Sequence, residues 1–68
     1  MFRFSKEDVG VRLYAPVQYS WMSEPVWDYI GSATNYRGEW TISTNRMRIG
    51  DIRTLLDEFE EWINEQSI

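Results

Sequence analysis

The sequence predicts an α+β fold, in which a small antiparallel β-sheet of roughly four or five short strands carries one C-terminal amphipathic α-helix packed across one face. Two observations predict it. Apolar residues after Asp51 recur at the spacing of one helical face, whereas several earlier segments alternate apolar and polar residues as strands do. We expect a single compact domain over 1–68, with the sheet in 1–49 and the helix in 51–66.

The composition excludes several classes of protein. The chain has no cysteine and no histidine, so it lacks a disulfide, a cysteine nucleophile and a serine–histidine triad, and it offers poor ligands for zinc. Four Trp, four Tyr and three Phe supply most of its large apolar side chains. There is no apolar run long enough to cross a membrane, and the N-terminus lacks the apolar stretch of a signal peptide. We therefore expect a cytoplasmic protein with no metal, no cofactor and no membrane partner.

The first two strands are predicted from short alternating segments. Residues 2–4 alternate and form the first strand, and the polar residues that follow form a turn closed by Gly10. The second strand begins at Val11, and Val11, Leu13 and Ala15 share one face. Pro16 has no backbone donor, so the strand ends there, lies at an edge or contains a bulge.

Residues 20–38 are expected to form an aromatic-rich loop. Within it, 23–30 can be read in two ways. Ser-Glu-Pro at 23–25 resembles a helix start, whereas the branched and aromatic residues at 26–30 prefer a strand. We favour a strand over 26–30, followed by a loop over 31–35.

The C-terminal part is expected to hold a hairpin and then the helix. Trp40 and Ile42 would face inward in a strand over 39–43, and 47–49 would return as its partner. Asp51 is placed as the helix N-cap. The helical face that would meet the sheet consists of Ile52, Leu55, Leu56, Phe59, Trp62 and Ile63.

The opposite face of the helix concentrates the negative charge of the chain. Residues 51–68 hold six acids and one base (net −5), whereas 1–50 hold five acids and six bases (net +1). The candidate partner-binding residues on this face are Asp57, Glu58, Glu60, Glu61 and Glu65. Like-charge neighbours four apart weaken a helix only slightly, and the functional interpretation is a surface kept for a basic partner. The alternative is a solvated face that serves solubility.

A row of carboxylates on a rigid helix can imitate a phosphate backbone. Small acidic proteins of phages and other mobile elements often inhibit host proteins in this way, although the likeness is one of class alone. We therefore expect a small non-enzymatic protein that binds, and in this reading inhibits, a protein with a basic surface. Exposed Trp21, Trp27 and Tyr36 would supply the anchoring contacts.

Other functions are weighed against this hypothesis. Single-stranded nucleic acid could bind to an outer sheet face through Arg12, Tyr14 and Arg48. The net charge of −4 makes this the weaker hypothesis. The aromatic residues could instead cover the core as a lid, or form the interface of a homodimer. The remaining route to catalysis is a carboxylate pair, Asp28 and Glu39, and its context does not support an enzyme.

Overall fold

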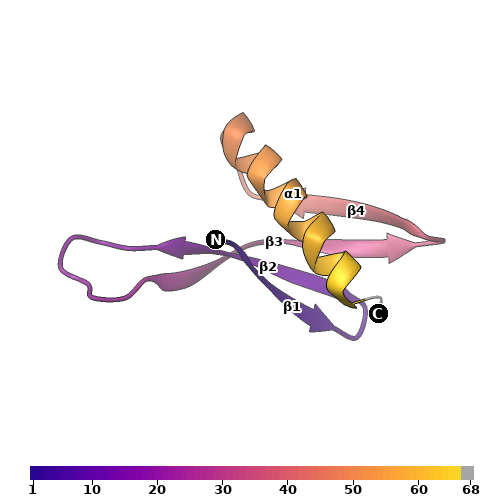
Figure 1. The fold of residues 1–68 in the computed structure, drawn as a ribbon, viewed down its shortest axis with the longest axis horizontal. Helices are drawn as coiled ribbons and strands as arrows, with labels where there is room; N and C mark the ends of the chain where they lie inside the picture. The colour runs from indigo at the N-terminus through magenta and orange to yellow at the C-terminus, as the bar shows by residue number, and fades with distance from the viewer. Residues whose placement is uncertain (67–68) are drawn as a thin grey trace.

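The computed structural model describes residues 1–66, which form a four-stranded antiparallel sheet crossed on one face by a single helix (Figure 1). The strands lie in the order β1-β2-β3-β4 and are followed by helix α1. Their bounds are β1 Arg3–Glu7, β2 Gly10–Val17, β3 Val26–Tyr36, β4 Glu39–Thr44 and α1 Ile49–Gln66. The α+β fold class predicted from sequence is confirmed.

The first hairpin is longer than predicted. Phe4 lies opposite Leu13 and Glu7 lies opposite Gly10, so β1 runs through the polar residues that were expected to form a turn. The turn is confined to Asp8 and Val9. Polar residues at 5–7 are compatible with a strand here because β1 is an edge strand and its side chains at these positions reach solvent.

The largest departure from the prediction is β3. The strand favoured over 26–30 is present, but it continues to Tyr36, so the predicted loop over 31–35 is wrong and the aromatic-rich loop shrinks from 20–38 to 18–25. The small residues that resembled a loop are required by packing. Gly31 and Ala33 are buried, and a Cβ on Gly31 would meet the carbonyl oxygen of Ser43 and lie 2.7 Å from the Thr44 Cα.

A β-bulge in β3 changes which side chains share a face. Leu13 lies opposite Gly31, whereas the next residue, Tyr14, lies opposite Tyr29, so Ile30 is an extra residue in β3. The bulge turns Tyr29 to the face that Tyr14 occupies. It leaves Ile30 half-buried against the core.

The second predicted hairpin is also wrong. β4 pairs with β3, and 47–49 do not return as a strand. The connection between β3 and β4 is Arg37-Gly38, both with positive φ (54° and 86°), as a two-residue type I′ turn requires. The Asn35 side-chain oxygen accepts a hydrogen bond from the Gly38 N–H at 3.0 Å and closes the turn.

Helix α1 begins two residues before the predicted start. The carbonyl of Arg48 accepts a hydrogen bond from the Ile52 N–H at 3.0 Å, so Arg48 occupies the N-cap position and Asp51 lies within the first turn. Asp51 is therefore not the N-cap. Its negative charge still lies close to the positive end of the helix dipole, where it is favourable.

The core lies between α1 and the inner face of the sheet. Its buried residues are Val11, Leu13, Ala33, Leu55 and Phe59. Phe59 is the centre of an aromatic cluster, with ring centroids 5.5 Å from Phe4, 5.2 Å from Trp40 and 6.1 Å from Trp62. Leu56, predicted on the same helical face, is 45% exposed and lies outside the core.

The β2–β3 hairpin extends beyond the rest of the sheet (Figure 1). Pairing with β1 stops at Tyr14, and pairing with β4 stops at Gly31. Beyond those points a two-stranded ribbon remains, formed by 15–17 and 26–28. This ribbon elongates the molecule, which is 44 Å long and 24 Å wide. Pro16 lies in this ribbon, where β1 no longer flanks β2. On the side of β2 away from β3, the missing N–H of Pro16 therefore costs no hydrogen bond between strands.

Candidate binding surfaces

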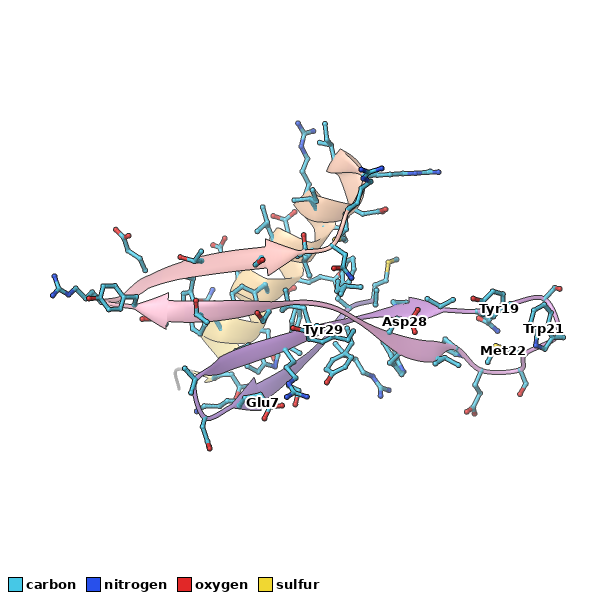
Figure 2. The ribbon with its side chains drawn as sticks, turned by 180° about the vertical axis from the view of Figure 1, so that it is seen from behind. Glu7, Tyr19, Trp21, Met22, Asp28 and Tyr29 are labelled. Atoms are coloured by element: carbon cyan, nitrogen blue, oxygen red, sulfur yellow. The ribbon has the colours of Figure 1, made fainter. Side chains whose placement is uncertain are left out.

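The loop 18–25, which we call the hairpin tip, presents a stacked pair of aromatic rings. Tyr19 and Trp21 have centroids 4.8 Å apart and planes 10° from parallel. Trp21 is 79% exposed and Tyr19 is 51% exposed. Figure 2 shows both rings at the far end of the ribbon, away from α1.

The hairpin tip is held by its own hydrogen bonds. The Met22 N–H donates to the Tyr19 carbonyl at 3.0 Å, which closes a turn around Trp21. The side-chain amide of Gln18 reaches across the loop to the carbonyls of Met22 at 3.2 Å and Ser23 at 3.5 Å. The two rings are therefore presented by a closed loop rather than by an open chain.

A second surface lies on the sheet face opposite α1, which we call the outer sheet face. Its aromatic and basic residues come from β1, β2 and β3: Arg3, Arg12, Tyr14, Trp27 and Tyr29. Arg3 lies opposite Tyr14, which lies opposite Tyr29, and directly opposite residues share a face. Figure 2 views the sheet from this side, with Tyr29 near its centre and α1 behind.

Ring contacts join four of these residues in two pairs. The Arg3 guanidinium carbon lies 4.2 Å from the centre of the Trp27 ring, within cation–π range. Tyr14 and Tyr29 meet edge to face at 6.0 Å. Hydrogen bonding to Tyr14, and then the charge of Glu7, raise the pKa of Arg12 above its ordinary value.

Glu7 also forms an ion pair with Arg12 on this surface, with Oε1 to Nε at 3.4 Å. Both side chains are about half exposed, so the pair contributes little stability. It does reduce the net positive charge of the outer sheet face. Arg3, which is stacked on Trp27, takes part in none of the ion pairs found in residues 1–66.

The acidic face of α1 retains four of its five predicted residues in solvent. Asp57, Glu60, Glu61 and Glu65 are exposed. Glu58 is turned toward the start of the chain: its Oε1 accepts hydrogen bonds from the Met1 amine at 3.0 Å and the Phe2 N–H at 2.9 Å, and its side chain is 25% exposed. Glu58 thus holds the N-terminal segment against α1.

The three predicted aromatic anchors do not lie together. Trp21 is at the hairpin tip, Trp27 is half-buried on the outer sheet face, and Tyr36 ends β3 at the opposite end of the sheet. Tyr36 is 71% exposed, with the Arg37 guanidinium carbon 5.3 Å from its ring centre. The acidic face, the hairpin tip and the outer sheet face are therefore three separate surfaces.

The predicted nucleic-acid residues are only partly brought together. Arg12 and Tyr14 share the outer sheet face, but Arg48 lies in the connection from β4 to α1, which leads to the opposite face (Figure 1). Arg3 and Tyr29 take part instead and were not predicted. Arg3 could have been identified from the alternation of β1, which puts its side chain on the other face from that of Phe4. Tyr29 could not, because its face depends on the bulge.

The carboxylate pair considered from sequence is not assembled. Asp28 lies opposite Ala15 in the ribbon, and Glu39 lies opposite Tyr36 at the other end of β3. Across residues 1–66, no group of three or more acidic, histidine or cysteine residues is placed to hold a metal ion. No helix in the same part of the chain is long and apolar enough to cross a membrane.

Comparison with known proteins gives no further guide. No protein-family model matches the chain, and no curated protein and no solved structure shows significant similarity to it. Its function has to be inferred from the three surfaces themselves.

Proposed function

We propose that the protein is a non-enzymatic cytoplasmic binding module that recognises another protein through the hairpin tip. One observation carries the proposal: Trp21, 79% exposed and stacked on Tyr19, is held by a closed loop at the end of a ribbon that extends beyond the core. Large exposed aromatic rings in an ordered loop are typical anchors of protein interfaces.

The hairpin tip has enough apolar surface to anchor a complex. A large aromatic ring can bury roughly 150–250 Å². At ~25 cal/mol per Å², one ring contributes about 4–6 kcal/mol before the costs of association. The stack with Tyr19 and the bonds from Gln18 limit the conformations of the free loop, so less entropy is lost when a partner orders it.

The exposed carboxylates of α1 serve a different role in this proposal. They lie on another part of the molecule from Trp21, so they act through their long-range field rather than within one compact site. Four carboxylates would accelerate encounter with a basic surface, and this effect weakens as salt screens it. If the partner itself binds nucleic acid, the acidic face would occupy the partner's nucleic-acid-binding channel and inhibit the partner.

Differential affinity capture tests the proposal. Tagged wild-type protein, Trp21→Ala and Tyr36→Ala are incubated with nuclease-treated lysate, and the retained proteins are compared. Tyr36→Ala is the matched control because it removes a similarly exposed aromatic ring at the other end of the sheet. We expect a protein that is retained by wild type and Tyr36→Ala and is absent with Trp21→Ala. Retention by Trp21→Ala, or loss only with Tyr36→Ala, would show that the hairpin tip is not the anchor.

The electrostatic role is tested on the captured partner by titration. Glu60→Gln with Glu61→Gln should slow association at low salt and flatten its salt dependence, while dissociation stays unchanged. Trp21→Ala should mainly accelerate dissociation, with a loss of at least ~30-fold in affinity if Trp21 is a hot spot worth about 2 kcal/mol. An unaltered salt dependence in the double variant would remove the role of α1.

A second candidate function is binding of single-stranded nucleic acid on the outer sheet face. The observation that favours it is the group of Arg3, Trp27, Tyr14, Tyr29 and Arg12 on one face, since rings stack on bases and arginines contact phosphates. Base stacking is worth roughly 1–3 kcal/mol per ring. Anisotropy of a labelled single-stranded oligonucleotide should rise at low salt, and Tyr14→Ala should weaken the binding while Trp21→Ala leaves it unchanged. A flat titration removes this candidate.

A further inference from the structure

The strand β4 has one edge with which no other strand of residues 1–66 pairs. β4 lies at one end of the sheet order, with β3 on one side, and within residues 1–66 no strand pairs with its other side. An unpaired strand edge presents a row of backbone N–H and C=O groups that can pair with another strand. We propose that this edge pairs antiparallel with β4 of a second copy of the chain, which joins the two sheets into one.

The two edges of the sheet differ in how they are protected. β1, at the other end, carries three charged residues among its five, Arg3, Lys6 and Glu7, and charge on an edge strand opposes pairing. β4 has six residues with a single charge, Glu39, and contains no proline, lysine, glycine or bulge. Its remaining residues are threonine, serine, isoleucine and tryptophan, of which three types favour strands.

The pattern of β4 is complementary to itself when two copies run antiparallel. Side chains directly opposite each other must share a face, and Trp40 and Ile42 occupy the inner face. Pairing Thr41 with its counterpart in the second copy places Trp40 opposite the second copy's Ile42, and the same contact occurs twice by symmetry. The single charged residue, Glu39, is at the start of β4, so antiparallel pairing places the two Glu39 side chains at opposite ends.

This pairing would extend a core that is incomplete at β4. Trp40 is 38% exposed although its ring contacts Phe59 edge to face at 5.2 Å. A neighbouring strand that brings isoleucine beside Trp40 covers this exposed part. Both copies of α1 then lie on the same face of the joined sheet, and the two hairpin tips extend from opposite ends. The dimer would therefore be bivalent for a hairpin-tip partner, independently of what that partner is.

Sedimentation velocity over a concentration series tests the pairing. Wild-type protein should move from a species of 8.2 kDa to one of twice that mass as concentration rises. Thr41→Lys places two ammonium groups opposite each other at the symmetry axis and should remain monomeric over the same range. The control is Thr34→Lys, which adds the same charge on the same face of the neighbouring strand, directly opposite Thr41, and should dimerise as wild type does. A wild-type monomer throughout, or dimerisation of Thr41→Lys, would overturn the proposal.

Amide hydrogen exchange of the wild-type protein locates the interface without a variant. The amides of β4 that point away from β3 should exchange more slowly at high concentration than at low concentration, while the amides of β1 should not change. Concentration-dependent protection at the hairpin tip or at β1 would assign the dimer to another surface and refute pairing through β4.

Discussion

The adjacent residues Leu55 and Leu56 offer a sharp test of where the core lies. Both belong to the apolar face predicted from helical spacing, but Leu55 is fully buried whereas Leu56 is 45% exposed. Truncation of leucine to alanine removes about three methylene equivalents, or ~2.4 kcal/mol of transfer free energy. At a fully buried position a cavity adds to this loss, which gives about 2–5 kcal/mol for Leu55→Ala. Leu56→Ala loses roughly half the transfer term and leaves no enclosed cavity, so we expect about 1 kcal/mol.

These costs are large relative to the stability of so small a domain. At 0.05–0.15 kcal/mol per residue, a chain of 68 residues has a free energy of unfolding of roughly 3–10 kcal/mol. Taking ~4–8 °C per kcal/mol, Leu55→Ala should lower Tm by at least about 10 °C, and Leu56→Ala by about 4–8 °C. Urea and thermal unfolding followed by far-UV circular dichroism measure both, at a protein concentration where sedimentation shows monomer, because dimerisation alone raises Tm.

Equal losses of unfolding free energy in Leu55→Ala and Leu56→Ala would refute the packing of α1 against the sheet described above. A difference in unfolding free energy below ~0.5 kcal/mol, the usual size of a surface effect, would mean that α1 is rotated about its axis relative to the sheet. A larger cost for Leu56→Ala than for Leu55→Ala would have the same meaning. The two substitutions share residue type, helix and neighbouring position, so differences in helix propensity cancel.

Other substitutions separate close packing from backbone conformation and from binding. Gly31→Ala should cost at least ~2 kcal/mol by urea unfolding, because its Cβ would lie 2.7 Å from the Thr44 Cα, and a near-neutral result would show that β4 can move away. Gly38→Ala has no atom within 4 Å of its Cβ and should cost only about 1 kcal/mol, from its positive φ; a cost as large as that of Gly31→Ala would contradict the turn geometry. Trp21→Ala should leave Tm within the range of ordinary surface variants, since a core role for Trp21 would appear as a clear drop. Glu58→Gln should lower stability by roughly 1 kcal/mol at low salt, and an equal loss at high salt would argue against the contact with the chain start.

The fold class and the helix were predictable because their signals are local. Six apolar residues at helical spacing specify a helix whatever surrounds it, and the alternation around Leu13 and Ile42 specifies which side of each strand faces the core. The acidic face of α1 was predictable for the same reason, since the positions opposite an apolar face are exposed. Glu58 is the exception, because its partners are the first two residues of the chain, 56 and 57 positions away.

The candidate surfaces depended on long-range pairing that no local pattern contains. The small residues of 31–35 resemble a loop when read alone, but they are the residues that allow β4 to approach β3 closely. Because β1 and β4 stop pairing at Tyr14 and Gly31, the rest of the β2–β3 hairpin extends beyond the sheet with Trp21 at its tip.

The sequence by itself determined the helix, the strand faces around Val11 and Trp40, and the separation of negative charge onto α1, because each follows from the period of neighbouring side chains. Only the tertiary structure decided that Tyr29 joins Tyr14 on the outer sheet face. Side chains in a strand alternate with a period of two, so the one extra residue at Ile30 reverses the face of the β3 residues before it. The position of this extra residue is set by the pairing of β3 with β2, which no local sequence pattern contains.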